Sequence, residues 1–248
     1  MISVDDVSVS LDGKKILDAV SFRIDGGESV ALLGSNGAGK STLIRSIAGM
    51  LPLTSGAVTI ASQEVSTQYR DEEWRQSIGF IPQNSPLVET ASVLTNVVHG
   101  FAGARGDWRC CLQSLARGWM RERAMQILDS VGLADKASKQ AGQLSGGEVQ
   151  RCSIARALVR EPKLVLADEP TASLDPATRQ EIHQLLRDTA AQAGSALLVS
   201  SHLVEEVRDF FQRLIALRDG SVILDRSTAD VSPDELNDIY KTGASRER

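Results

Sequence analysis

The feature that most constrains this chain is a strand, a glycine-rich turn and a helix that follow one another near the N-terminus. The strand is predicted from Ser29–Leu33, an apolar run of the kind that lies in the middle of a sheet. Apolar residues then recur at helical spacing within residues 41–50. The turn, residues 34–41, reads Gly-Ser-Asn-Gly-Ala-Gly-Lys-Ser and fits G-x-x-x-x-G-K-S/T without a mismatch. This order predicts a phosphate-binding loop in an α/β fold.

Each residue type in this loop has a physical use at a phosphate. Glycine lets the backbone come close and turn its N–H groups inward, and the following helix adds the positive end of its dipole. Lys40 is expected to bridge the β- and γ-phosphates of a nucleotide, and Ser41 is expected to hold Mg²⁺. The residues predicted to surround the phosphates are Gly34, Ser35, Asn36, Gly37, Ala38, Gly39, Lys40, Ser41 and Thr42.

A second apolar run, residues 163–167, ends in the two carboxylates Asp168 and Glu169. In an open parallel sheet, side chains at the carboxyl ends of the strands gather at the edge where ligands bind. Asp168 is therefore expected to share the Mg²⁺ with Ser41. Glu169 points elsewhere and is expected to polarise a water molecule for attack on the γ-phosphate.

The order of the predicted segments extends this α/β fold to the whole chain. Predicted strands at 196–200 and 213–217 alternate with helical segments at 176–193 and 204–211, which is typical of a parallel sheet covered on both faces. The first 30 residues alternate in hydropathy and predict an antiparallel β-subdomain. Residues from about 85 to 160 predict an inserted helical subdomain, so residues 1–248 are expected to form one domain. In the tail, Ser232 and Glu235 have the spacing of a capping box.

Composition excludes several classes of protein. The 27 Lys and Arg against 32 Asp and Glu give a net charge of −5, which argues against a general nucleic-acid binder. No run approaches the roughly 20 apolar residues that cross a bilayer, and the N-terminus does not resemble a secretory signal. The three cysteines and three histidines show no metal-ligand spacing, which favours a cytoplasmic protein with free thiols. His99 and His183 are interpreted as structural residues.

Further motifs resemble those of ABC-type ATPases and occur in the family's order. The sequence Leu-Ser-Gly-Gly-Glu at 144–148 resembles the family's signature. Gln83 resembles the Q-loop glutamine, Ser-Leu-Asp at 173–175 resembles the D-loop, and His202 resembles the switch histidine. The resemblance covers essentially the whole chain. It implies the P-loop NTPase core of an ABC ATPase, with ATP and Mg²⁺ as its ligands.

The resemblance also implies roles for these residues. Glu169, His202 and Gln83 would act in catalysis, with Gln83 also contacting Mg²⁺. Two copies would pack head to tail, so that the signature of one chain faces the phosphate loop of the other across an ATP. A serine and two glycine amides at a helix N-terminus suit a second anion site. The residues that would contact nucleotide from the signature and the D-loop are Ser145, Gly146, Gly147 and Asp175.

One position departs from the family. An aromatic residue usually stacks on adenine from the first strand, but the matching residue is Leu11, and no Phe, Tyr or Trp precedes Phe22. Base stacking on an aromatic ring is worth about 1–3 kcal/mol. Either ATP binds less tightly, or aliphatic contact from Leu11 suffices. In both cases modest discrimination between ATP and GTP is expected.

A narrower resemblance concerns the transported solute. Residues 96–100, 131–137 and 216–220 are similar to phosphonate importer ATPases, from which phosphite and hypophosphite importers are not separable. This resemblance implies a peripheral subunit on the cytoplasmic face of the inner membrane. Its partners would be transmembrane permease subunits and, through them, a solute-binding protein, with no nucleic acid.

The amino-acid sequence leaves two questions open. The basic and aromatic stretch 104–123 suits a permease dock, and a solvated helical face is the alternative. The other functions left open are import of another solute, a non-transport ABC-like subunit of the carbon–phosphorus lyase system, and a soluble ABC ATPase of DNA repair or translation.

Overall fold

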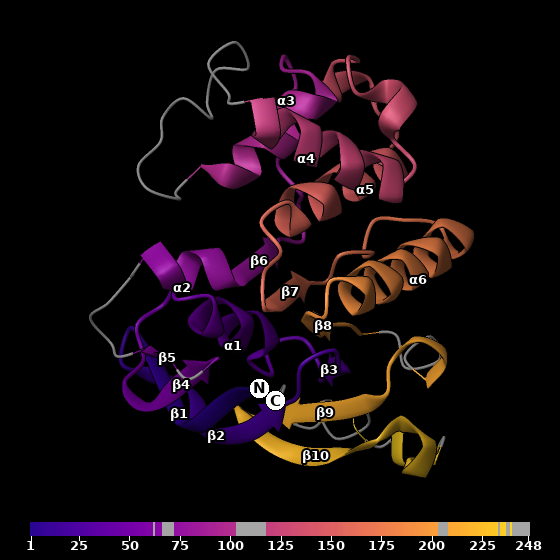
Figure 1. The fold of residues 1–248 in the computed structure, drawn as a ribbon. Coiled ribbons are helices and arrows are strands. Elements are labelled where there is room, and N and C mark those ends of the chain that lie inside the picture. The colour runs from indigo at the N-terminus through magenta and orange to yellow at the C-terminus, as the bar shows by residue number, and fades with distance from the viewer. Residues whose placement is uncertain are drawn as a thin grey trace.

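The computed structural model describes residues 1–61, 63–65, 72–102, 118–202, 208–232, 234–236 and 239. These residues build two sheets and a group of helices at one end of the molecule (Figure 1). The first sheet is antiparallel, with four strands in the order β2-β1-β4-β5. Its strands are β1 (Ile2–Leu11), β2 (Lys14–Ile24), β4 (Ser55–Ile60) and β5 (Gln63–Val65).

The second sheet has six strands in the order β10-β9-β3-β8-β7-β6. All neighbours are parallel except β10, which returns antiparallel to β9. The strands are β3 (Ser29–Leu33), β6 (Ile78–Ile81), β7 (Leu164–Asp168), β8 (Ala196–Ser200), β9 (Arg213–Arg218) and β10 (Ser221–Ser227). The predicted α/β class, with a parallel core and an antiparallel β-subdomain, is confirmed.

The described segments between β6 and β7 are helical and stand above the sheets in Figure 1. The α-helices are α1 (Lys40–Ile47), α2 (Glu72–Ser77), α3 (Val93–Val98), α4 (Gly118–Ser130), α5 (Gly146–Leu158) and α6 (Pro176–Gln192). The 3₁₀ helices are η1 (His99–Phe101), η3 (Ala134–Lys136), η4 (Ala141–Gln143) and η5 (Thr228–Asp230). None of the helices in the described ranges is long and apolar enough to cross a bilayer.

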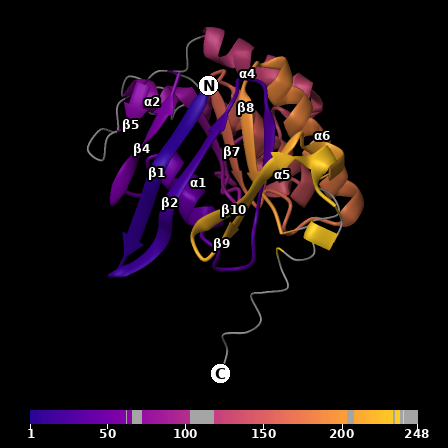
Figure 2. The same ribbon diagram turned by 90° about the horizontal axis from the view of Figure 1, so that it is seen from below.

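Two hydrophobic clusters cover the two faces of the six-stranded sheet. Val30 and Leu32 face a cluster that includes Ile44 of α1 and the antiparallel sheet. Ala31 and Leu33 face a second cluster that includes α6 and the helices between β6 and β7. Figure 2 shows α1 between the two sheets and α6 on the other side. Because β3 is covered on both faces, its sequence is apolar without alternation.

Some ends of the elements differ from the sequence prediction. The helix expected to reach residue 50 ends at Ile47, because Gly49 has a φ of +69° and terminates it in the left-handed conformation. The predicted capping box is confirmed, since the N–H of Ser232 donates to Glu235 at 2.9 Å and the N–H of Glu235 donates to Ser232 at 3.3 Å. Residues 204–207 of the segment predicted to be helical lie outside the described residues.

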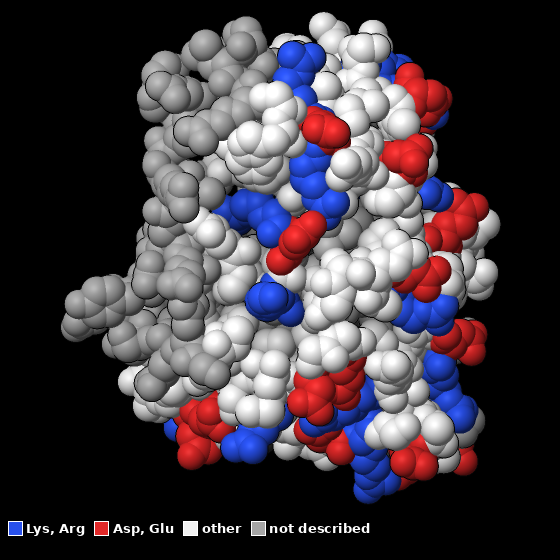
Figure 3. All heavy atoms as spheres, viewed as in Figure 1, with Lys and Arg blue, Asp and Glu red and all other residues white. Residues whose placement is uncertain are grey.

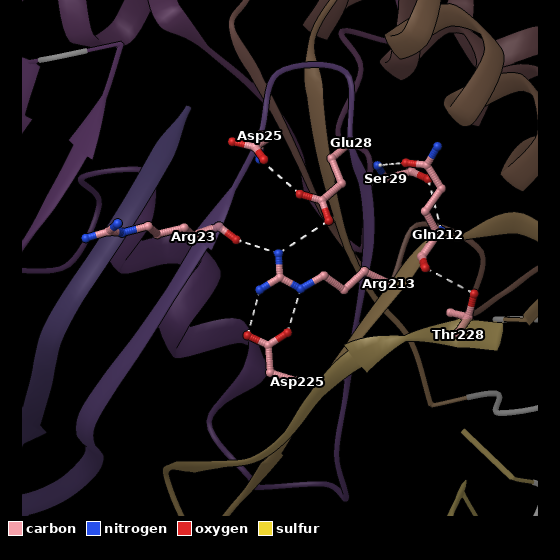
Figure 4. Close-up of polar contacts among 8 residues, drawn as sticks. All are labelled: Arg23, Asp25, Glu28, Ser29, Gln212, Arg213, Asp225 and Thr228. Carbon is pink, nitrogen blue, oxygen red and sulfur yellow. Dashed lines mark hydrogen bonds and ion pairs between the residues drawn. The ribbon is translucent and has the colours of Figure 1, made fainter. Parts of the chain in front are cut away.

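A guanidinium group ties the ends of the two sheets together (Figure 4). Arg213, the first residue of β9, donates two hydrogen bonds to the carboxylate of Asp225 on β10, at 2.5 and 2.7 Å. It also donates to the carbonyl of Arg23 on β2 at 2.8 Å and to Glu28 at 3.3 Å. Beside it, Gln212 accepts a hydrogen bond from the N–H of Ser29 at 3.1 Å. The network fixes the chain where β2 passes into β3.

His183 of α6 is buried. Its surroundings predict how the free energy of unfolding depends on pH. Its Nε2 lies 3.2 Å from the hydroxyl of Thr171, and its ring packs on Phe210 and Phe211. Burial, helped by Arg179, lowers its pKa from 6.5 to about 4. The folded state therefore favours neutral His183, and this stabilisation is present above pH 6.5 and is lost as the pH falls toward 4. The full loss is about 3 kcal/mol.

Urea unfolding at several pH values between 7 and 4 measures this effect. Carboxylates also titrate near the lower end, so the informative quantity is the difference between the parent and His183→Gln. We expect the variant to lose part of its stability at pH 7 and to show a smaller decline on acidification. A decline as steep as that of the parent would contradict the assignment to His183.

Candidate nucleotide-binding site

The glycine-rich loop packs so tightly against two strands that glycine is required. Gly34 has a φ of +152°, and a Cβ atom there would lie 2.5 Å from the carbonyl oxygen of Leu217 on β9. Gly39, the N-cap of α1, has a φ of +105°, and a Cβ atom there would lie 2.7 Å from the side chain of Leu17 on β2. Any larger residue at either position would displace the loop.

Between Gly34 and Gly39, the tip of the loop is exposed and the residue that follows the tip is buried. Asn36 and Gly37 are exposed, and Gly37 has a φ of +82°. Ala38 is buried, and its N–H donates to the carbonyl of Ser35 at 3.1 Å. Thr42 is half-buried in the first turn of α1. The loop therefore reaches the surface at its tip and is anchored at both ends.

Lys40 opens α1 and turns its ammonium group back into the loop. Its Nζ donates to the carbonyls of Gly34 at 2.8 Å and Ser35 at 3.4 Å, and lies 3.7 Å from an oxygen of Glu169. Burial lowers the pKa of Lys40, and the charges of Glu169 and Asp168 oppose that shift. A buried cation inside a glycine cradle fits a phosphate group.

Asp168, at the end of β7, is buried and accepts two hydroxyl hydrogen bonds. Its Oδ1 accepts from the hydroxyl of Ser41 at 2.8 Å and from the hydroxyl of Ser200 at 3.0 Å. Its Oδ2 lies 3.7 Å from the guanidinium of Arg45. Hydroxyl and carboxylate oxygens are hard ligands, so Ser41 and Asp168 together fit Mg²⁺.

The backbone turns Glu169 away from Asp168. Glu169 has a φ of 45°, in the left-handed region that costs a non-glycine residue roughly 1–2 kcal/mol. Its N–H donates to the hydroxyl of Ser200 at 2.8 Å, which holds the turn. Its carboxylate then lies between Lys40, at 3.7 Å, and the Nδ1 of His202, at 3.4 Å. The two adjacent carboxylates therefore contact different groups.

Ser200 is the residue of this site that sequence analysis missed. It is buried at the end of β8 and lies directly opposite Asp168 in the register of β7 and β8. One hydroxyl thereby joins the side chain of Asp168 to the backbone of Glu169. The signal available in the sequence was a hydroxyl residue two positions before His202, at the end of an apolar strand.

Gln83 follows strand β6, and Leu11 is the last residue of strand β1. Gln83 follows β6 by two residues and is exposed, and the last residue of β6, Ile81, pairs with Ala167 of β7. This register brings Gln83 to the same edge of the sheet as Asp168. Leu11 ends β1 and is half-buried against the cluster around α1. Contact of either residue with nucleotide stays a prediction.

The signature forms the N-terminus of α5. The hydroxyl of Ser145 accepts the N–H of Glu148 at 3.4 Å, and the N–H of Ser145 donates to the carboxylate of Glu148 at 2.8 Å, which makes a capping box. Gly147 lies against α6, where a Cβ atom would come within 2.8 Å of the methyl group of Thr178. Gly146, the first residue of α5, lies between Ser145 and Gly147.

Asp175 has a structural role that the sequence analysis did not assign. It is the N-cap of α6, and its Oδ1 accepts the N–H groups of Thr178 and Ala177, each at 3.1 Å. The hydrogen bonds from Thr178 lower its pKa. Pro176 follows at the first helical position, where its missing N–H is not needed. The predicted nucleotide contact of Asp175 would add to this capping role.

The two motifs that would contact phosphate belong to different parts of the chain. Lys40 and Ser41 make their contacts with the loop and the end of β7. Ser145 and Gly147 make theirs within α5 and against α6. The two candidate anion sites therefore lie on different elements of the described chain.

A groove of about 350 Å³ lies between α4, α5 and α6. Arg151 donates to Glu181 across it at 2.8 Å. Its lining residues are Ser130, Arg151, Glu181, Gln184, Leu185, Asp188, Thr189 and Gln192. Since this lining contains none of the predicted nucleotide ligands, the groove is distinct from the candidate site.

This chain is similar to known proteins in sequence and in fold. The family described as ABC transporter matches residues 17–172. The hypophosphite import ATP-binding protein HtxD of Stutzerimonas stutzeri is 36% identical over 242 residues, which cover 97% of this chain and 71% of HtxD. The phosphonates import ATP-binding protein PhnC of Nitratidesulfovibrio vulgaris is 40% identical over 232 residues, which cover 92% of this chain and 86% of that protein.

A solved structure of an ATP-binding cassette is similar to this chain in fold. It is a dimeric ATP-binding cassette in a post-hydrolysis state with ADP and Pi, and it matches with a TM-score of 0.76 and 31% identity. The match covers 92% of this chain and 99% of the cassette. By sequence, fold and the arrangement of its motifs, this chain belongs to the ABC transporter family and is an ATPase of the ABC type.

Proposed function

We propose that this chain is the ATP-hydrolysing motor subunit of an ABC importer for phosphonates or related phosphorus oxyanions. The observation that carries the motor role is the convergence of Lys40, Ser41, Asp168, Glu169 and His202 at one edge of the parallel sheet. The names of the importer subunits that this chain resembles support the solute class. We further propose that residues 1–248 act as one ATP-binding domain whose inserted helical subdomain spans about 85–160.

The loop residues bind the nucleotide in this proposal. Backbone N–H groups from Gly34 to Thr42 surround the phosphates, and Lys40 provides the positive charge at the β- and γ-phosphates. Ser41, Asp168 and Gln83 would hold Mg²⁺, which neutralises the charge that develops on the phosphates. Leu11 would cover one face of adenine.

Glu169 acts in the chemical step. Its carboxylate accepts a proton from a water molecule as the water oxygen bonds to the γ-phosphorus, and the bond to the bridging oxygen of ADP breaks. Ser200 fixes the backbone of Glu169 for this step through the 2.8 Å hydrogen bond. His202, at 3.4 Å, holds the carboxylate from the other side. The general-base role fits the position of Glu169 between Lys40 and His202.

Two copies would complete the site. In the head-to-tail arrangement, Ser145, Gly146 and Gly147 of one copy lie at the γ-phosphate bound by the other, and Asp175 lines the interface. The separation of the two candidate anion sites within one chain supports this proposal. The dimeric cassette with ADP and Pi shows that a protein of this fold can dimerise in a nucleotide-bound state.

The helical subdomain would dock on permease subunits at the cytoplasmic face of the membrane, with a solute-binding protein beyond them. Residues 103–117 of the predicted dock lie outside the described residues. Within its described end, Trp119 is 53% exposed and packs edge-on against Phe101. Figure 3 shows Lys and Arg side chains over α4, beside the grey residues, with Asp and Glu side chains among them. Basic and aromatic side chains suit a surface near anionic lipid.

Growth of a deletion strain tests the solute class. Loss of the gene should abolish growth on a phosphonate or phosphite as the sole phosphorus source, while growth on phosphate continues. The Lys40→Ala chain should fail to restore growth, and the parent chain should restore it. Purification of the tagged chain should recover a permease. Recovery of soluble enzyme subunits in place of a permease would favour the lyase alternative, and normal growth on both sources would contradict the assignment of solute.

A further inference from the structure

We propose that Lys136 is a positioning residue that neutralises Glu148, so that the signature can accept the γ-phosphate of the ATP bound by a second copy. Glu148 is the last residue of the signature, and a carboxylate there would repel an anion at the same helix end. This inference rests on the proposed function and deepens it. It assigns a role to a residue that lies outside the nucleotide-binding motifs described above.

The geometry places the carboxylate of Glu148 beside the helix N-terminus. One oxygen, Oε2, accepts the N–H of Ser145 at 2.8 Å, so the charge is held next to the N-cap of α5. The other oxygen, Oε1, accepts a hydrogen bond from Nζ of Lys136, at the end of η3. Both oxygens are therefore engaged, and the carboxylate cannot turn away without breaking the capping box.

Charge explains why this pairing matters for function. The N–H of Ser145 is used by Glu148, which leaves the amides of Gly146 and Gly147 and the helix dipole to meet a phosphate. Without Lys136, the full negative charge of Glu148 would cancel part of the positive potential that the helix N-terminus offers to a phosphate. The hydrogen bonds from Lys136 and Ser145 lower the pKa of Glu148 to about 2, so Glu148 is charged at neutral pH. Lys136 is its counter-charge.

A merely structural role makes a different prediction. If Lys136 only joined η3 to α5, removal of either partner would break the same ion pair and have the same effect. If Lys136 neutralises the site, removal of Lys136 harms the site, and removal of the charge on Glu148 in the same chain repairs it. Glu148→Gln keeps an acceptor for the capping box and removes only the charge.

The test measures dimerisation of the full chain as a function of ATP concentration. All variants carry Glu169→Gln, so that hydrolysis does not consume the ATP, and dimers are counted by light scattering. We expect Lys136→Met to raise the ATP concentration at half-dimerisation about tenfold, which corresponds to about 1.4 kcal/mol. Adding Glu148→Gln should return it to the value of the background chain.

Two controls sharpen the test. Lys139→Met removes the same charge three residues further on. No carboxylate of the described chain pairs with Lys139. This variant should therefore leave the ATP concentration at half-dimerisation unchanged. Glu148→Gln alone, which leaves Lys136 unbalanced, should lower the ATP requirement, and this variant serves even if Lys136→Met does not fold.

Two results would overturn the inference while the proposed function stands. One is dimerisation of Lys136→Met at the ATP concentration of the background chain. The other is a defect that Glu148→Gln fails to repair. A background chain that forms no dimer at any ATP concentration would overturn the proposed function together with this inference.

Discussion

Replacing Glu169 by glutamine is expected to lower steady-state ATP hydrolysis by about 10²–10⁴-fold, the usual contribution of a positioned general base. ATP binding should persist, because in the proposed function Lys40 and the loop amides, not Glu169, contact the phosphates. Removal of the carboxylate also removes the ion pair with Lys40 at 3.7 Å, so binding should become slightly tighter. Turnover and equilibrium binding of ATP on the same preparation measure both effects.

Glu161→Gln is a matched control. Glu161 is also a glutamate in the left-handed conformation, with a φ of 54°, and it pairs with Arg123 at 2.7 Å on an exposed surface. Its substitution should leave turnover at the parent value. Hydrolysis by Glu169→Gln at the parent rate would show that another group activates the water.

Replacing Ser145 by arginine is expected to prevent the ATP-dependent dimer from closing and to bring turnover close to zero. A long charged side chain at the N-cap of α5 would fill the place where the γ-phosphate of the other copy must lie. Each chain should still bind ATP, because Lys40 and Ser41 belong to the other candidate anion site. Sedimentation with ATP and a parallel binding titration separate the two properties.

Loss of an N-cap alone costs about 1 kcal/mol, so this experiment requires a stability control. Ser232→Arg removes a similar capping box, with Glu235, from the tail. It should show a comparable loss of stability and parent turnover. Mixing Ser145→Arg with Lys40→Ala chains should regain part of the activity, because one interface of the mixed dimer is intact. Full activity of a monomeric Ser145→Arg chain would exclude the shared site.

Sequence analysis predicted the positions of the central strands and helix better than the residues at which the elements end. The apolar runs at β3 and β7 and the pattern around Lys40 depend on neighbours within about ten residues, and all three were located correctly. The early end of α1 depends on Gly49 adopting a left-handed φ, which a hydrophobic pattern does not show. Helix ends are set by single residues, whereas helix positions are set by the whole periodic segment.

Contacts between distant segments could not be predicted from one sequence. Ser200 reaches Asp168 only because β8 and β7 pair in one particular register. Lys136 reaches Glu148 because the fold brings the end of η3 beside the N-terminus of α5. Both partners lie in the sequence without a motif that joins them. The left-handed turn at Glu169 was likewise invisible, since glutamate has no local preference for it.

The position of β3 has a consequence for how this protein is made. Both strands that pair with β3, namely β8 and β9, come from the last quarter of the chain, with β9 ending at Arg218. A ribosome adds about 5–20 residues per second, so β3 waits roughly 10–40 s for its second partner. Until β8 has been made, β3 has neither of its neighbouring strands. β3, which has the same amino-acid composition as β8, therefore enters the six-stranded sheet only after residues 196–200 have been made.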